Sequence, residues 1–237
     1  MAQKTVNLPG IGDVVLAKRK GTRHLRLSIS ADGRIRVGLP YWAPYQAGIN
    51  FAQSRAEWIK RHNPAATDTL LTDNMRIGKS FRLRFMRDNS ARTVRSRITG
   101  NQILIKSPYD STQSDVQKVA AAACERALKK DAEKLLPMRL KDVARAKGFK
   151  YRSVRIKRLR SRWGSCSSQQ DITLNYYLMQ LPWRLIDYVI LHELVHTAHL
   201  HHGTEFWQSM DSLLPDVKQM RKDIKAHKPV LAPQAIA

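Results

Sequence analysis

Apolar and polar residues alternate along most of the first 110 residues, which is the pattern of strands with one buried face. The alternation predicts six strands, over residues 14–17, 24–30, 34–38, 80–86, 93–98 and 102–106. The turn residues 31–33 predict that the second and third strands form a hairpin. Between the two groups of strands, apolar residues at helical spacing predict one helix over residues 45–62, which Asn63 and Pro64 end.

Helical spacing dominates the second half of the chain. Residues 115–136 are rich in Ala, Leu, Lys and Glu and predict a long helix, with Ser114 and Gln117 resembling a capping box. Pro137 is expected to break or kink this helix, and Gly148 to end a second helix that follows it. Further on, the pattern predicts a short antiparallel strand pair over 151–159 and 172–178, a helix that starts at Pro182, and helices over 204–214 and 216–227. We find no internal repeat in the sequence.

Residues 191–207, LHELVHTAHLHHGTEFW, contain five of the eight histidines. In a helix, His192 and His196 leave the same face one turn apart, so both imidazoles can bind one metal ion. Glu193 lies beside the pair, where a carboxylate can take a proton from zinc-bound water and pass it to a leaving amine. Because zinc lowers the pKa of its water to about 7, the pattern predicts one Zn²⁺ ion and hydrolysis, above all of a peptide bond.

A catalytic zinc ion usually takes three protein ligands, so a third donor is needed. The nearby donors are His199, His201, His202 and Glu205. Ligands on three consecutive turns of a helix would spread over about 10 Å, which argues against His199. His202 is favoured because Gly203 behind it favours a helix stop that lets the chain turn back. The alternative is a histidine-rich tract that binds metal adventitiously, but such a tract would not need Glu193.

The motifs HELVH and HHGTEFW, preceded by SRWGSCSS and ITLNYYL, resemble the YgjP-like metallopeptidases, relatives of the SprT-like and minigluzincin groups. The segments RHLRLSISADGRIRVGLP and AEWIKRH also look like the opening of that family. The resemblance implies that His192, His196 and His202 bind zinc and that Glu193 is the general base. The extra histidines His199 and His201 depart from the family pattern and leave the choice of ligands open. Family members also carry a description as nucleoside triphosphate pyrophosphatases, so the resemblance leaves the substrate open too.

Several residues before the histidine motif are candidates for contact with substrate. Trp163 and Gly164 match the WGSC segment of the family, in which the glycine would let the backbone approach the metal helix. Trp163 could equally be a packing residue in a tight turn. A peptide could lie extended along residues 172–178, within reach of Asn175 and Tyr176. The candidates for stabilising an oxyanion are Tyr176, Tyr177 and Arg162, and the sequence does not choose among them.

The chain has 42 Lys and Arg against 19 Asp and Glu, for a formal net charge of +23. From Arg76 to Lys106 there are nine basic residues against Asp88 alone, so alternation predicts a basic sheet face. Such a face could bind nucleic acid non-specifically through phosphates, or it could be a solvated surface. With no signal segment, no long apolar run and only Cys124 and Cys166, the chain is expected to be cytoplasmic, without a membrane partner or a disulfide.

These observations predict an α+β protein with a basic β-rich region over 1–110, a small zincin-type domain over 111–227 and a flexible tail over 228–237. In the second domain, the HExxH helix is expected to pack on a short antiparallel sheet. The predicted function is that of a zinc metalloendopeptidase acting on a peptide or protein substrate. The alternatives are a nucleoside triphosphate pyrophosphatase and a nucleic-acid-associated protein with a structural metal.

Overall fold

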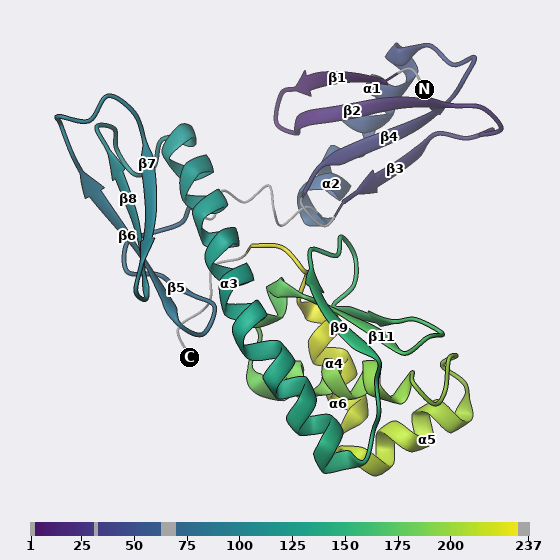
Figure 1. Ribbon diagram of the computed structural model, residues 1–237. Helices are drawn as coiled ribbons and strands as arrows, with labels where there is room; N and C mark the ends of the chain where they lie inside the picture. Colours follow the sequence, from purple (N-terminus) through teal and green to yellow (C-terminus); the bar gives the residue numbers. More distant parts are fainter. Residues whose placement is uncertain (1–2, 31–32, 63–69, 232–237) are drawn as a thin grey trace. The chain divides into compact units, whose positions relative to one another are not determined.

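The computed structural model describes residues 3–30, 33–62 and 70–231. The chain divides into two compact units, Met1–Thr69 and Leu70–Ala237, each with its own buried apolar cluster (Figure 1). The architecture is α+β, as predicted, with three small sheets and six α-helices in the described ranges. None of those helices has the length and apolar character that crossing a bilayer requires.

The first unit is one four-stranded sheet covered by two helices. Its strands are β1 (Gln3–Leu8), β2 (Gly12–Arg19), β3 (Arg26–Ile29) and β4 (Ile35–Pro40), in the order β1-β2-β4-β3. The predicted hairpin is present as the antiparallel pair of β3 and β4, although part of its turn lies outside the described residues. The single helix predicted over 45–62 is divided at Arg55 into α1 (Tyr45–Ser54) and α2 (Ala56–His62). Strand β1 was not predicted.

The second unit begins with a sheet of the same topology. Its strands are β5 (Arg76–Ile77), β6 (Phe81–Arg87), β7 (Arg95–Thr99) and β8 (Gln102–Ser107), in the order β5-β6-β8-β7. In both sheets the central pair is parallel and the two outer pairs are antiparallel. In both, the last strand leads into a Pro-Tyr dipeptide, Pro40-Tyr41 or Pro108-Tyr109, before a helix. The chain therefore contains a structural repeat that the sequence pattern did not reveal.

Helix α3 (Ser114–Lys147) joins this sheet to the rest of the second unit. Pro137 lies inside the helix and does not break it, so the two helices predicted on either side of this proline are one. Leu136, just before the proline, and Leu140, three residues after it, are fully buried, so packing offsets the one backbone hydrogen bond that proline removes. Gly148 closes the helix with a φ of 74°, as expected. The predicted capping box is absent, because the amide of Gln117 instead bonds both backbone groups of Leu71.

The predicted domain boundary near residue 110 differs from the structure, in which the division falls between Thr69 and Leu70. The reason is burial: Leu83 and Ile103 of the sheet share one apolar cluster with Leu128 of α3 and with the histidine helix. Buried Asp131 on α3 strengthens this junction. Its carboxylate accepts hydrogen bonds from the backbone N–H groups of Lys79 (2.7 Å) and Ser80 (3.0 Å).

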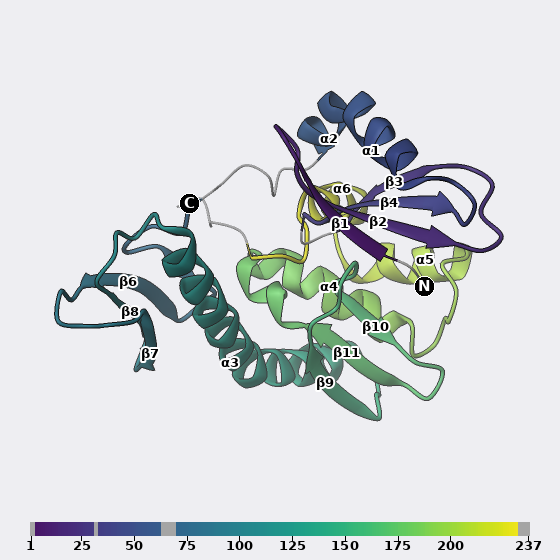
Figure 2. The same cartoon turned by 90° about the horizontal axis from the view of Figure 1, so that it is seen from above.

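The remainder of the unit is a three-stranded sheet packed against helices (Figure 2). Its strands are β9 (Ser153–Lys157), β10 (Gly164–Cys166) and β11 (Asp171–Asn175), in the order β10-β11-β9. The prediction of an antiparallel pair was wrong, because β9 and β11 are parallel. The segment between them contains β10, which forms the hairpin with β11. The strand predicted to run to Leu178 ends at Asn175, and residues Tyr176–Gln180 form a 3₁₀ helix.

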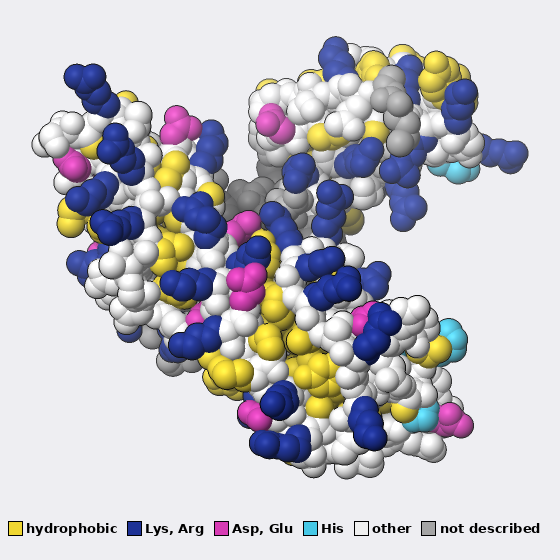
Figure 3. All heavy atoms as spheres, in the orientation of Figure 1, with side chains coloured by type: hydrophobic (Ala, Val, Ile, Leu, Met, Phe, Trp, Pro, Cys, Tyr) yellow, Lys and Arg dark blue, Asp and Glu magenta, His cyan; other side chains and the backbone are white. Residues whose placement is uncertain are grey.

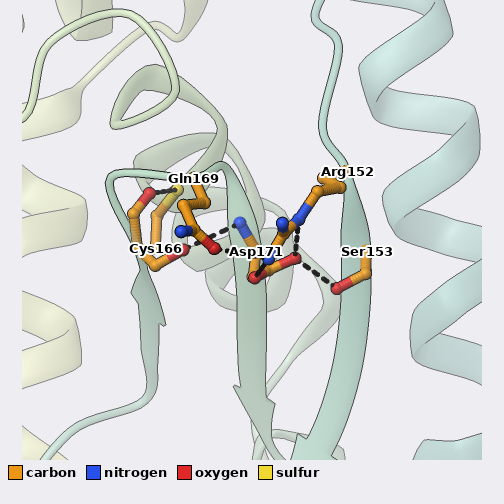
Figure 4. A network of polar contacts seen from close by, with 6 residues as sticks. Arg152, Ser153, Cys166, Gln169 and Asp171 are labelled. Atoms are coloured by element: carbon orange, nitrogen blue, oxygen red, sulfur yellow. Dashed lines mark hydrogen bonds and ion pairs between the residues drawn. The ribbon is translucent and has the colours of Figure 1, made fainter.

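A network of polar contacts links the first residues of the parallel strands β9 and β11 (Figure 4). The Asp171 carboxylate at the start of β11 accepts hydrogen bonds from the Arg152 guanidinium (2.8 Å from Nε) and the Ser153 hydroxyl (2.6 Å) beside it. Arg152 also donates to the side chain of Gln169 in the β10–β11 connection. The hydrogen bond from Arg152, followed by that from Ser153, holds the pKa of Asp171 well below its usual range.

Three helices complete the unit: α4 (Trp183–Val195), α5 (Thr204–Leu213) and α6 (Val217–Ala226). All three were predicted. The expected flexible tail is partly packed, since Pro229 is buried and the carbonyl of Val230 accepts a hydrogen bond from Gln180. Residues 232–237 of that predicted tail lie outside the described residues.

Candidate metal centre

Helix α4 positions the first two histidines. One face of the helix, which includes Leu185, Ile186 and Leu194, is buried in the core of the unit. The helix ends at Val195, and the backbone N–H of the capping residue His196 donates to the carbonyl of His192 at 3.3 Å. This spacing places the two imidazole rings on one side of the helix, with centroids 4.9 Å apart. The predicted helix and its one-turn spacing are therefore present.

His202 returns to the pair after the chain turns between α4 and α5. Its Nε2 atom lies 2.9 Å from Nε2 of His192 and 3.1 Å from Nε2 of His196. In the described parts of the chain, this is the one group of three or more His, Cys, Asp or Glu donors found that could hold a metal ion. Tetrahedral zinc–nitrogen bonds of about 2.0–2.1 Å separate neighbouring ligand nitrogens by about 3.3 Å, which is close to the spacing of this triad.

The protonation of His192 and His196 suits a metal. The Nδ1 atom of His196 lies 3.0 Å from the carbonyl oxygen of His199, an acceptor, so that nitrogen carries the proton and Nε2 keeps its lone pair. Burial, with smaller contributions from His196 and His202, lowers the pKa of His192 to about 3. Burial also lowers the pKa of His196. Neutral imidazoles with free lone pairs are the form that binds metal, so these residues fit a zinc ion.

The other candidate ligands are held elsewhere. His199 faces α5, with Nε2 3.3 Å from the hydroxyl of Ser209 and Nδ1 3.5 Å from the Glu205 carboxylate. The Glu205 side chain is 83% exposed, and His201 is also exposed. Of the four candidates for the third position, the structure therefore brings only His202 to the pair.

Aromatic residues of α5 support the triad. Phe206 is fully buried, and its ring centroid lies 4.6–4.9 Å from those of all three imidazoles. Trp207 stacks on His202 with centroids 5.9 Å apart and planes 25° apart. The Arg221 guanidinium from α6 lies 4.4 Å from the centroid of the Trp207 ring. His202 lies outside any helix, and it is held in place by Trp207, which is in turn covered by Arg221 of α6.

Glu193 is 4% exposed and lies against β10. A Cβ atom on Gly164 would stand 2.6 Å from Oε1 and 2.7 Å from Cγ of Glu193, so only glycine leaves room for this carboxylate. The predicted close approach of the backbone to the metal helix is therefore confirmed. Burial raises the pKa of Glu193 to about 8, against an opposing contribution from Arg162.

A cavity of about 470 Å³ opens over these groups. Its lining comprises Arg162, Trp163, Gly164, Ser165, Cys166, Tyr188, Val189, His192, Glu193, His196, Leu200, His202 and Ile224. The predicted contacts Arg162, Trp163 and Gly164 are among them. Sequence reasoning missed Tyr188, although it lies one helical turn before His192, and it missed Ile224, which no local pattern connects to the motif.

The predicted contacts Asn175 and Tyr176 do not line this cavity. Asn175 is fully buried, and its amide donates to the carbonyls of Leu159 (2.8 Å) and Arg162 (3.0 Å). The hydroxyl of Tyr176 lies 3.4 Å from Glu125 on α3, and that of Tyr177 also donates to Glu125. These contacts hold the loop before β10 and the 3₁₀ helix in place, so the three side chains belong to the scaffold.

Comparison with known proteins identifies the family to which the chain belongs. Residues 23–227 match the family described as "YgjP-like, metallopeptidase domain". No curated protein matches this chain. Similar solved structures include the metallopeptidase zymogens abylysin of Pyrococcus abyssi (22% identity, TM-score 0.36) and jannalysin of Methanocaldococcus jannaschii (20% identity, TM-score 0.36). Each alignment covers 39% of this chain, and 93% and 96% of those chains respectively. Because the family match extends over most of the sequence and includes every residue of the cavity, the chain belongs to the YgjP-like metallopeptidase family.

Proposed function

We propose that this protein is a zinc-dependent endopeptidase. The observation that carries the proposal is the triangle of imidazole nitrogens on His192, His196 and His202, beside the buried carboxylate of Glu193 and under an open cavity. The three histidines would hold the zinc ion. When bound, zinc would acidify a water molecule and polarise the carbonyl of the scissile bond.

Glu193 would move the protons of the reaction. As a carboxylate it would accept a proton from the attacking water, and as an acid it would return that proton to the departing amine nitrogen. A pKa raised to about 8 leaves both forms accessible near neutral pH. Burial and the contact with Gly164 limit the directions in which the carboxylate can point.

The peptide would bind along β10. The expectation that it would lie along residues 172–178 is not compatible with the sheet, because β11 is already paired on both edges, with β10 and with β9. Strand β10 lines the cavity and pairs only with β11 in its sheet, so its other edge can bond an extended peptide backbone. Tyr188 and Arg162 also line the cavity and are the donors we assign to the oxyanion.

The alternative, hydrolysis of a nucleoside triphosphate, has less support from the cavity. Arg162 is the one Lys or Arg in the described lining, which otherwise includes Val189, Leu200 and Ile224. A triphosphate needs several cationic or backbone N–H partners to offset its charge. An apolar wall instead suits a side chain of a peptide substrate.

The proposal is tested by measuring zinc content and hydrolysis of an unfolded protein such as casein by wild type, Glu193→Gln and His202→Ala. We expect about one zinc ion per chain in wild type and in Glu193→Gln, but hydrolysis only in wild type. His202→Ala should lose both. Glu205→Gln, at an exposed carboxylate of the same segment, is the matched control and should keep both.

Full hydrolysis by Glu193→Gln would refute the role given to this carboxylate. The same proteins are then tested for release of pyrophosphate from nucleoside triphosphates. Pyrophosphate release that depends on His202 and Glu193, without casein hydrolysis, would overturn the peptidase proposal in favour of nucleotide hydrolysis.

A further inference from the structure

We propose that the face of the β5–β8 sheet opposite α3 is a binding surface for the phosphate backbone of duplex nucleic acid. This surface, the basic face, is defined by six exposed side chains: Arg76, Arg82, Arg84, Arg95, Arg97 and Lys106. The proposal is independent of the peptidase function, because the basic face uses none of the residues that line the cavity.

Strand register places the six cations on one face. Successive side chains alternate between faces, and the side that carries Leu83, Ile103 and Ile105 is buried in the cluster shared with α3. On the opposite side, Arg76 stands across from Arg82, and Lys106 across from Arg95. Leu104 lies between Arg84 and Arg97 in one row across three strands. Figure 3 shows Lys and Arg side chains spread over this part of the molecule.

Little negative charge offsets these cations. The strands themselves contribute no Asp or Glu to the face. Asp73, before β5, lies 3.8 Å from Nε of Arg84, and both side chains are 49% exposed, so the pair is weak. The pKa of Asp88, in the turn after β6, is lowered first by hydrogen bonds from Ser90 and to a smaller extent by the charge of Lys106. Like charges that stand opposite each other in a sheet are unfavourable unless an anion neutralises them, so six cations with two neighbouring acids leave the face in need of a counter-charge.

The repeated topology shows that the fold does not require this charge. The sheet of the first unit has the same strand order and pairing. Its corresponding face carries three cations and one acid in the strands, namely Arg19, Arg26, Arg36 and Asp13. The second sheet carries twice as many cations and no acid on an equivalent frame. The additional charge is therefore a property of this surface and not a consequence of building the sheet.

The chemistry of the face favours phosphates presented by a duplex. Five of the six cations are arginines, whose planar guanidinium can bond two phosphate oxygens at once. The other described side chains of the face on these strands, Met86, Thr99, Gln102 and Leu104, include no aromatic ring. Proteins that bind single strands stack the bases on aromatic rings, which this face does not offer. A duplex needs no such platform because its phosphates face outward, and recognition would be independent of sequence.

Helix α3 lies between the β5–β8 sheet and the part of the second unit that contains β9, β11 and α4 (Figure 1). Arg126 on α3 bonds Ser96 of β7 at 2.8 Å, whereas Arg139, farther along the helix, bonds Asp187 of α4 at 2.7 Å. The β5–β8 sheet and helix α4, which carries His192 and His196, thus contact different stretches of α3. A duplex bound to the sheet would hold the peptidase site at a fixed distance from nucleic acid.

The test measures the binding of a fluorescent 20-base-pair DNA duplex by anisotropy at several salt concentrations. The variant Arg82→Glu/Arg84→Glu/Arg97→Glu is compared with a control that reverses three exposed lysines of α3, Lys130→Glu/Lys134→Glu/Lys141→Glu. Both variants change the net charge equally, and circular dichroism checks that both are folded. We expect the face variant to bind about tenfold or more weakly at low salt, with its log–log salt slope reduced by about 2.7 for three lost phosphate contacts. The control should stay close to wild type.

Four outcomes would overturn the proposal. The first is an absence of duplex binding by wild type at low salt, and the second is an equal loss of binding in both variants, which would assign binding to net charge alone. The third is a preference for a single strand of equal length. The fourth is tighter binding to vesicles containing phosphatidylserine that the face variant loses to the same extent. Glu193→Gln should bind duplex as wild type does. Failure of duplex binding therefore remains distinct from failure of the peptidase proposal.

Discussion

Replacing Gly164 by alanine tests the link between β10 and the proposed general base. The added Cβ atom would stand 2.6 Å from Oε1 of Glu193, whereas ordinary contacts begin at 3.4 Å, so something must move by about 0.8 Å. Glu193 is buried and Gly164 is paired with Leu174 in the sheet, so neither can move freely. Overpacking of this kind costs about 1–3 kcal/mol. At about 2–4 °C per kcal/mol, the melting temperature should fall by about 2–12 °C.

The effect on hydrolysis should be larger than the effect on stability. A displacement of about 1 Å in a reacting group can reduce the rate about 100-fold. We therefore expect Gly164→Ala to lose hydrolysis by about that factor while it keeps its zinc, because the three histidines are not displaced. The assay combines casein hydrolysis, zinc content and a thermal melt.

Gly203→Ala is the matched control, since no atom lies within 4 Å of its added Cβ and its φ is −76°. It should lose less than about 1 kcal/mol of stability, as expected for alanine at a helix N-cap, and retain hydrolysis. A Gly164→Ala protein with the melting temperature and activity of wild type would refute the argument that the glycine makes room for Glu193.

Two further predictions concern the third histidine and the cysteines. Trp207→Leu and Arg221→Gln should each weaken zinc binding about 10–100-fold, because the stack that fixes His202 would be lost. Competition with a chelator measures the zinc affinity. An unchanged affinity in both variants would show that the stack does not support the metal centre. Burial, with Glu193 nearby, raises the pKa of Cys166 to about 11, so its reaction with iodoacetamide should be slow at pH 7 and accelerate as the pH rises and thiolate forms. Cys124, fully buried with a pKa raised to about 12, should react only after unfolding, and its labelling in the folded protein would contradict this burial.

Local patterns predicted the elements whose formation depends on local chemistry. The HExxH helix was recognisable because four-residue spacing alone puts His192 and His196 on one side of a helix. Gly203 was expected to stop a helix after His202, but α4 already ends at Val195, and Gly203, with a φ of −76°, is the N-cap of α5. His202 nevertheless reaches the pair, because the loop between α4 and α5 brings it there. Glycine in the WGSC motif correctly indicated close packing on the helix, although it did not show that the partner would be the Glu193 side chain.

Non-local pairing explains the differences between prediction and structure. Alternation in residues 151–159 and 172–178 predicted two strands but could not predict their relative direction. The two strands are parallel because β10, which lies between them in the sequence, forms the hairpin with β11. Asn175 and Tyr176 lie within the ITLNYYL motif and carry polar side chains, yet their partners are a loop carbonyl and a helix carboxylate that periodicity does not locate. The domain boundary was displaced for the same reason, since the second sheet is buried against α3.

The sequence by itself determined the candidate donors, their one-turn spacing, the carboxylate beside them that we propose as general base, and the excess of positive charge. These properties depend on residue type and on the geometry of a single helix. Only the tertiary structure decided that His202 completes the triad, that Trp207 and Arg221 brace it, and that β10 is the open edge. It also placed six cations on one sheet face. Each of these depends on contacts between segments far apart in the chain, and such contacts are selected by burial of the whole core, which no local window of sequence contains.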